Sequence, residues 1–115
     1  MNPVNFYKCL ADDTRLRCLL LIQHEYELCV CELTAAIDES QPKISRHLAQ
    51  LRKYEILTDR RQGQWIFYQI NPELANWAKE IILTTLNANP AWIEPNIANL
   101  NAMGERPIRM QTCCS

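Results

Sequence analysis

Glycine is scarce in this sequence of 115 residues, which contains only Gly63 and Gly104. Loops that cradle the phosphates of nucleotides need several glycines close together, so the Rossmann and P-loop classes are excluded. The metalloprotease H-E-x-x-H, hydrolase G-x-S-x-G and redox C-x-x-C sequences are absent as well. Without a catalytic motif, we expect a protein that is not an enzyme and has no catalytic cofactor.

Long apolar runs are also absent, because the longest, residues 18–22, is far too short to span a bilayer. Residues 1–5 have neither the basic region nor the apolar core of an export signal. We therefore expect a cytoplasmic protein with no membrane partner, whose six cysteines are reduced thiols rather than a disulfide framework. The length corresponds to one folded core.

Charge is nearly balanced over the whole chain, with a net value of −1, but it is unevenly distributed. Residues 41–64 hold six lysines and arginines against two carboxylates, a local charge of +4, which leaves −5 for the remainder. A basic segment inside an otherwise acidic chain is typical of a surface that meets nucleic acid.

Hydrophobic periodicity predicts a mainly helical domain. Residues 56–58 and 65–70 are β-favouring runs on either side of a basic turn that contains Gly63, which indicates a hairpin. From residue 87 onward prolines interrupt the pattern, so we expect a loosely ordered extension with one short helix near residues 96–103. The predicted longer helices cover residues 4–10, 13–24, 29–37, 41–54 and 71–86.

The third and fourth predicted helices have the arrangement of a helix-turn-helix, in which the second helix enters the major groove of DNA. Ser40 is a suitable N-cap for that second helix. An isolated charged face is more often simply solvated, but the helix spacing, the segregated charge and the basic hairpin together favour a winged helix-turn-helix that binds double-stranded DNA. The candidate DNA contacts are Gln41, Lys43, Ser45, Arg46 and His47 in the helix, and Arg60, Arg61 and Gln64 in the hairpin. His47 has an alternative role as a structural histidine.

The predicted helix over residues 71–86 is more apolar than one small core requires. Its stripe includes Trp77, Ile81 and Ile82, which belong either to the core or to an interface between two copies. A two-fold dimer would bury these side chains and match two DNA half-sites about one helical turn apart. We therefore expect a homodimer.

Cysteine is the one unusual residue type, and Cys29 and Cys31 lie at the predicted start of the third helix. Positions i and i+2 of a regular helix point in very different directions, so one ion held by both thiolates would bend the backbone. Thiolates select soft cations, and such a bend would couple their binding to the DNA-reading helix. Two small buried residues would give the same pattern without any ligand. Cys9 and Cys18 are predicted to fill the core, and Cys113 and Cys114 either contribute to a site or are inert.

Four segments together resemble the ArsR/SmtB family of metal-responsive repressors, and the resemblance extends over about residues 5–86. It implies a homodimeric winged helix that binds operator DNA without inducer and releases it when As(III) or Sb(III) binds thiolates, with Cys29 and Cys31 as ligands. Residues 1–86 would then form the DNA-binding and dimerisation domain, and residues 87–115 a C-terminal extension. The segments that carry the resemblance are residues 10–16 (LADDTRL), 27–33 (ELCVCEL), 40–48 (SQPKISRHL) and 59–65 (DRRQGQW).

The chain departs from the arsenic-responsive members of that family at Thr34, where they often carry a third cysteine. Trivalent arsenic favours three thiolates, so the third ligand is missing, external, or supplied by Cys113 or Cys114. A cadmium or lead sensor of the same family also uses C-V-C, but with a cysteine pair in an N-terminal arm, where this chain has only Cys9. Zinc-sensing members of the family have histidine ligands on the last helix. Residues 71–115 of this chain contain no histidine, so the resemblance does not extend to a zinc site there.

Two other functions use the same thiols. Oxidation of Cys29 and Cys31 would make a redox-switched regulator, and Cys113 and Cys114 would serve a small thiol oxidoreductase. The oxidoreductase would need a partner base or a redox fold, and the sequence indicates neither.

Overall fold

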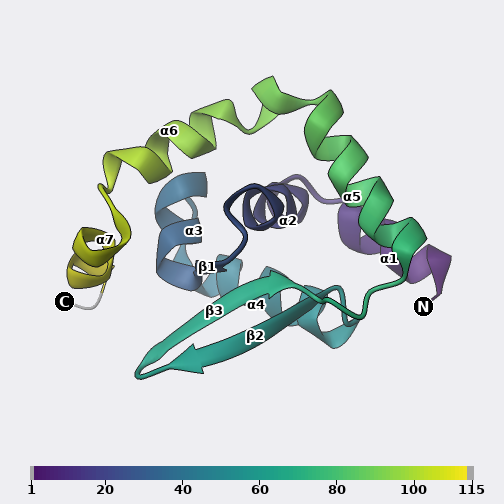
Figure 1. The fold of residues 1–115 in the computed structure, drawn as a ribbon, viewed down its shortest axis with the longest axis horizontal. Coiled ribbons are helices and arrows are strands. Elements are labelled where there is room, and N and C mark those ends of the chain that lie inside the picture. The colour runs from purple at the N-terminus through teal and green to yellow at the C-terminus, as the bar shows by residue number, and fades with distance from the viewer. Residues whose placement is uncertain (1, 114–115) are drawn as a thin grey trace.

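The computed structural model describes residues 2–113, with side chains as far as residue 110. Helices α5, α6 and α7 arch over α2 and α3, and the β2–β3 hairpin lies on the opposite side (Figure 1). The elements in chain order are α1 (Pro3–Leu10), α2 (Asp13–Glu25), β1 (Leu28–Cys29), α3 (Val30–Ile37), α4 (Gln41–Lys53), β2 (Leu57–Gln62), β3 (Trp65–Ile70), α5 (Asn76–Ala88), the 3₁₀ turn η1 (Pro90–Trp92), α6 (Glu94–Ala102) and α7 (Arg106–Cys113).

Side-chain caps explain where three of the predicted helices begin. The Asn2 side chain accepts from the Val4 N–H at 2.8 Å, and Asp12 accepts from the Arg15 N–H at 2.9 Å. The Ser40 side chain caps α4 and accepts from the backbone N–H of Lys43, the third residue of that helix. These polar groups satisfy N–H donors that have no partner inside the helix, and the predicted boundaries of α1, α2 and α4 agree with the structure to within one residue.

The core is built around α2, in which residues 18–22 are all completely buried. Leu33 of α3 and Leu48 of α4 pack into the same cluster, which fixes the two helices of the helix-turn-helix against α2. Cys9 and Cys18 are 1% and 0% exposed, which confirms their predicted place in the core. Burial raises the pKa of Cys18 to about 12, so its thiol stays protonated.

The sheet has the order β1-β3-β2, and both pairings are antiparallel. The hairpin is confirmed, and Gly63 takes a φ of 62° at its turn, where a left-handed backbone is needed. Strand β1 was not predicted, because two residues are too few to show an alternating pattern. Its Cys29 lies opposite Phe67 of β3, so the prediction that Cys29 is helical was wrong and α3 begins at Val30.

The predictions for the C-terminal part also need correction. Helix α5 begins at Asn76 rather than near residue 71, because the Asn71 side chain accepts from the Glu73 N–H at 3.0 Å and holds a turn. The described part of the extension is not loosely ordered: Leu100 of α6 is completely buried, and Asn96 donates to the carbonyl oxygen of Ala36 at 3.0 Å. Within the described residues, no helix is both long and apolar enough to cross a membrane.

Candidate DNA interface and thiol site

Helix α4 buries one face and presents the other to solvent. Ile44, Leu48 and Leu51 are completely buried. Gln41 and Arg46 are exposed on the first turns, and Lys43 and Ser45 are half-buried beside them. Four of the predicted contacts therefore lie together at the N-terminal half of α4, with donors and acceptors suited to base edges and phosphates.

His47 lies differently from these four residues, because its ring packs between α2 and α4. Its Nδ1 atom is 3.2 Å from a guanidinium nitrogen of Arg15, and Nε2 is 3.7 Å from a carboxylate oxygen of Asp12. The side chain is 14% exposed, and this burial lowers the pKa of His47 despite the nearby Asp12 carboxylate. These contacts match the structural role for His47, and its contact with DNA stays a prediction.

The predicted wing residues also divide into two groups. Arg60 and Arg61 are neighbours on β2 and point to opposite faces of the strand. Both side chains are exposed, but Arg60 also donates from Nε to Glu27 at 2.8 Å and lies over the Phe67 ring at 4.7 Å. Gln64 is exposed next to the glycine of the turn. The Arg60 hydrogen bond lowers the pKa of Glu27, so this ion pair is charged at neutral pH.

The two predicted thiol ligands lie on either side of the junction between β1 and α3. Cys29 is the N-cap of α3, with extended backbone angles (φ −92°, ψ 169°), and its free thiol is 3% exposed. Burial raises the pKa of Cys29 to about 11. Because Cys29 precedes the helix, its direction is not fixed by the helical period, and the expectation that both cysteines lie inside a regular helix was wrong.

Cys31 is half-buried in the first turn of α3 and is disulfide-bonded, which departs from the expectation of six reduced thiols. Cys29 is free, so the two cysteines are not joined to each other. Among the described residues, no group of three or more His, Cys, Asp or Glu side chains forms a metal site. The side chain of Cys113, and the whole of Cys114, lie outside the described residues.

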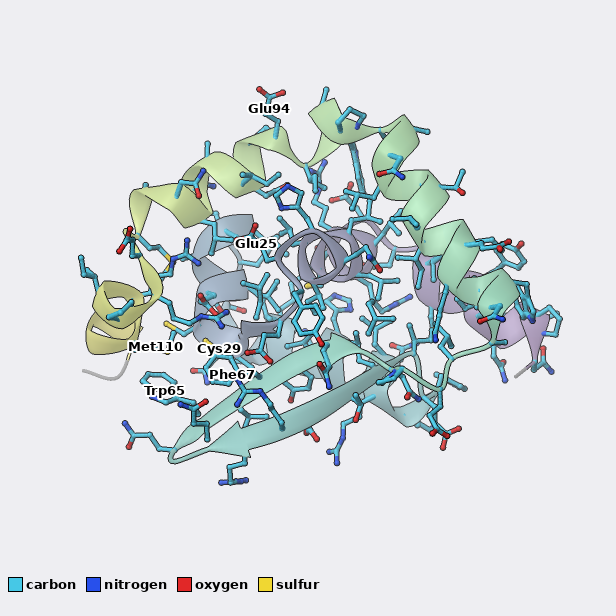
Figure 2. All side chains as sticks on the ribbon, viewed as in Figure 1. Glu25, Cys29, Trp65, Phe67, Glu94 and Met110 are labelled. Carbon is cyan, nitrogen blue, oxygen red and sulfur yellow. The ribbon has the colours of Figure 1, made fainter. Side chains whose placement is uncertain are left out.

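A buried carboxylate lies between these cysteines and α7. Glu32 is completely buried, and it accepts from the Cys29 N–H at 3.1 Å, from Arg106 at 3.2 Å and from Arg109 at 3.0 Å. We call Glu32, Arg106 and Arg109 the Glu32 clamp. Arg106 lies over the Phe67 ring at 4.8 Å, and in the view of Figure 2 Met110 of α7 projects near Cys29 and Phe67, so the clamp holds α7 near the thiol site. A buried carboxylate needs such partners, because an unpaired charge in the interior is strongly unfavourable.

Sequence reasoning missed the clamp. Its arginines lie in a segment expected to be loosely ordered, and their carboxylate partner is more than seventy residues away in the sequence. The one available signal was the i, i+3 spacing of Arg106 and Arg109, which is compatible with a single helix face. Without the fold, that spacing does not identify Glu32 as the partner.

The predicted dimer residues have different degrees of exposure. Trp77 is 39% exposed and packs edge-on against Phe6, with ring centroids 5.1 Å apart. Ile81 is half-buried, whereas Ile82 is completely buried inside the single chain and is a core residue. Helices α1 and α5 lie side by side (Figure 1). The large exposed apolar side chains on these two helices are Val4, Tyr7, Trp77 and Leu83.

Comparison with known proteins identifies relatives over nearly the whole chain. The family of bacterial regulatory proteins called the arsR family matches residues 12–59, from α2 to β2. The arsenic resistance transcriptional regulator ArsR2 of Pseudomonas putida is 52% identical over 114 residues, which cover 99% of each chain. The arsenical resistance operon repressor of Escherichia coli is 45% identical and covers 85% of this chain and 84% of that protein.

Solved structures of regulators share the fold. HlyU from Vibrio cholerae has a TM-score of 0.66 and 29% identity, and covers 74% of this chain and 88% of its own. The antimony-specific transcriptional repressor AntR has a TM-score of 0.63 and 31% identity, and covers 76% of this chain and 77% of its own. The prediction of a mainly helical winged helix-turn-helix is confirmed, and the relatives are transcriptional regulators rather than enzymes.

Proposed function

Because this chain belongs to the ArsR family of bacterial regulatory proteins, we propose that it represses transcription by binding operator DNA and releases the DNA when As(III) or Sb(III) binds its cysteines. One observation carries the proposal: Cys29 and Cys31 flank the start of α3, the first helix of the helix-turn-helix. A ligand bound at this position acts directly on α3, the helix that supports α4. This function needs reduced thiols, and cysteines are usually reduced in the cytoplasm.

On the DNA side, α4 enters the major groove. Gln41 and Arg46 are placed to hydrogen-bond base edges, because these side chain types recognise adenine and guanine. Lys43 and Ser45 contact phosphates beside them, and Arg61 and Gln64 contact the flanking backbone from the wing. His47 and Arg60 make contacts within the chain instead: His47 holds α4 to α2, and the exposed Arg60 holds the wing to Glu27.

A second copy of the chain completes the DNA-binding unit. The exposed apolar side chains of α1 and α5 give a surface that a two-fold partner would bury, with Trp77 and Ile81 at its centre. Two recognition helices related by that axis would match a palindromic operator. Exposed Val4 and Tyr7 extend the surface onto α1.

The donor set at the α3 junction fits trivalent arsenic or antimony, because both are soft and prefer sulfur. When bound, the inducer forms covalent bonds to thiolates. Cys29 is also the residue that pairs with Phe67 of β3, so any shift of its backbone reaches both the wing and the first helix of the helix-turn-helix. To move the equilibrium from 1:99 to 99:1, binding must favour the released conformation by about 10⁴-fold, or about 5.5 kcal/mol.

The test is operator binding by Cys29→Ser, measured by fluorescence anisotropy with and without arsenite. We expect this variant to bind the operator like the parent protein and to resist arsenite. Cys9→Ser, at the other end of the molecule's core and also a buried free thiol, is the matched control and should respond to arsenite normally. Release of the Cys29→Ser variant by arsenite would show that the inducer binds elsewhere.

The disulfide at Cys31 favours a second candidate, a repressor switched by thiol oxidation. In that case peroxide would release the operator, a thiol reductant would restore binding, and arsenite would have no effect on the fully reduced protein. Mass spectrometry after each treatment, set beside the anisotropy, distinguishes oxidation from arsenic adducts.

A further inference from the structure

One arginine at the start of α2 connects three helices, and neither the DNA contacts nor the thiol site described above use it. Arg15 donates from Nε to the carbonyl oxygen of Cys9 at 2.7 Å and from Nη2 to that of Lys8 at 3.0 Å. Its Nη1 atom donates to Nδ1 of His47 and to Oε1 of Gln50, both at 3.2 Å. The guanidinium therefore joins two carbonyl groups in the last turn of α1 to two side chains of α4.

The hydrogen bond from Arg15 determines which nitrogen of the His47 ring carries the hydrogen. A guanidinium stays charged and has only donors, so Nδ1 of His47 must accept and Nε2 must carry the hydrogen. The Nε2 atom is 3.7 Å from the Asp12 carboxylate, which in turn accepts from the backbone N–H of Arg15 at 2.9 Å. A second proton on the ring would place an N–H donor on Nδ1 against the Arg15 donor and break this contact.

Charged groups of α2 and α4 surround the His47 ring. Asp12 and Arg15 lie at the start of α2, and Lys43 and Arg46 lie on α4 itself, whereas the groups of α1 that bind Arg15 are backbone carbonyl oxygens. Burial is the main cause that lowers the pKa of His47, and the three cations lower it further, while the Asp12 carboxylate raises it. The ring is therefore neutral at pH 7 and gains a proton only in mild acid.

We propose that Arg15 is a positioning residue for DNA binding: through the neutral His47 ring it sets α4 against α1 and α2, and a proton on that ring weakens operator binding. This inference rests on the proposed function, in which α4 enters the major groove. A histidine that faced a phosphate would have the opposite effect, because its protonated ring would strengthen binding in acid. The direction of the pH dependence therefore distinguishes a positioning role of His47 from a direct contact with DNA.

The experiment measures operator affinity of the full chain by fluorescence anisotropy from about pH 5.5 to about pH 8, at constant ionic strength. Affinity should be level above about pH 7 and should fall in acid by up to about tenfold per pH unit, the limit for one linked proton in each chain. His47→Asn keeps an acceptor oxygen near the position of Nδ1 but does not titrate, so it should lose this dependence. His24→Asn is the matched control and should keep it, because His24 is exposed and pairs with Glu25.

A second pair of variants tests the guanidinium. Arg15→Gln should weaken operator binding at neutral pH by about two- to tenfold, the equivalent of one net hydrogen bond. Arg17→Gln is the control, because Arg17 is also on α2 but donates to the carbonyl oxygen of Trp92 at 2.6 Å. Nitrogen NMR should show the Nε2–H form of His47 in the parent protein, and the pKa of His47 should rise in Arg15→Gln only. A purely structural role for Arg15 would lower the melting temperature and leave the pKa of His47 unchanged.

Failure of this inference is distinct from failure of the proposed function. Affinity that rises or stays level as the pH falls would overturn the inference, as would an Nδ1–H form of His47 or a His47→Asn variant with the parent profile. A parent protein that does not bind the operator at neutral pH would instead overturn the proposed function, and so would release of Cys29→Ser by arsenite, whichever ring nitrogen of His47 carries the hydrogen.

Discussion

The N-terminal halves of α4 and α3 differ in where their polar groups lie. On α4 the polar groups face solvent, and Gln41 and Arg46 are exposed and ready for a partner molecule. At the start of α3 the polar groups are buried, and Glu32 and Cys29 are satisfied by other parts of the same chain. A surface for a large external partner can be made from one helix, whereas a site that must sense a small ligand and transmit its presence is assembled from several segments.

The difference also separates two roles of arginine in this molecule. Arg46 and Arg61 are exposed at the surface, where water solvates their charges in the free protein. Arg60, Arg106 and Arg109 instead pair with carboxylates of the same chain: Arg60 with Glu27 at the surface, and the two arginines of α7 with the buried Glu32. Basic residues of the first kind should control affinity for DNA, and those of the second kind should control stability and inducer response.

The largest effect is expected from Glu32→Ala. It removes a buried carboxylate that holds a backbone N–H and two arginines, and loss of one partner from such an internal network lowers the free energy of unfolding by about 3–5 kcal/mol. Urea unfolding followed by circular dichroism measures the change. Exposed Glu80→Ala on α5 should stay within about 0.5 kcal/mol of the parent protein. A loss below about 1 kcal/mol for Glu32→Ala would mean that the clamp does not hold α7.

Next in size is Arg46→Ala, which should weaken specific operator binding by about 1–3 kcal/mol and leave the free energy of unfolding unchanged. We expect this because the guanidinium is exposed and its proposed partner is the DNA. Anisotropy titrations against operator and scrambled duplexes measure the loss of specificity. Arg52→Ala, whose guanidinium pairs with Asp59 at 3.3 Å, is a control on the same helix. Equal losses for both variants would contradict a specific contact by Arg46.

A smaller effect is expected at the wing, where neighbouring arginines should behave differently. Arg61→Ala should weaken binding to all duplexes alike and reduce the slope of log K against log salt by about 0.9, the value for one phosphate contact. Arg60→Ala should leave the slope nearly unchanged, because Arg60 is paired with Glu27. Identical salt slopes for the two variants would remove the distinction between Arg61 and the carboxylate-paired Arg60.

The smallest effect concerns pH. Hydrogen bonding from Arg60 lowers the pKa of Glu27 below its ordinary value, so the folded state binds this proton less tightly than the unfolded state. The resulting stability is fully present above the pKa of an unfolded glutamate, about 4.3, and is lost as the pH falls through the lower folded pKa. Urea unfolding between pH 3 and 7 should show this loss, and Glu27→Gln should have a flatter profile over the same range. Parallel profiles would show that the pair contributes nothing.

What the sequence predicted correctly is what neighbouring residues determine. Helix α2 begins at its Asp12 cap, α4 begins at its Ser40 cap, and the hairpin turns at Gly63. The polar face of α4 followed from the same local periodicity, whereas the DNA contacts assigned to that face stay a prediction.

What the sequence did not predict depends on distant partners. Strand β1 exists because Cys29 pairs with a residue of β3, and the described part of the C-terminal extension is ordered because α6 and α7 pack on α3. His47 looks like its basic neighbours in the sequence, and only the positions of Asp12 and Arg15 show that its ring packs inward. Periodicity carries no information about such contacts between segments.

The place of Cys29 at the start of α3 has a consequence for local opening. Helices usually begin at Ser, Thr, Asp or Asn, whose oxygen accepts firmly from the first free amides, while sulfur is a weak acceptor. The first turn of α3 should therefore fray more readily than that of α4, and the amide hydrogens of residues 30–32 should exchange faster than those of residues 41–43. The inducer would then bind at a turn that opens more readily than the first turn of α4, so less free energy would be needed to unwind it.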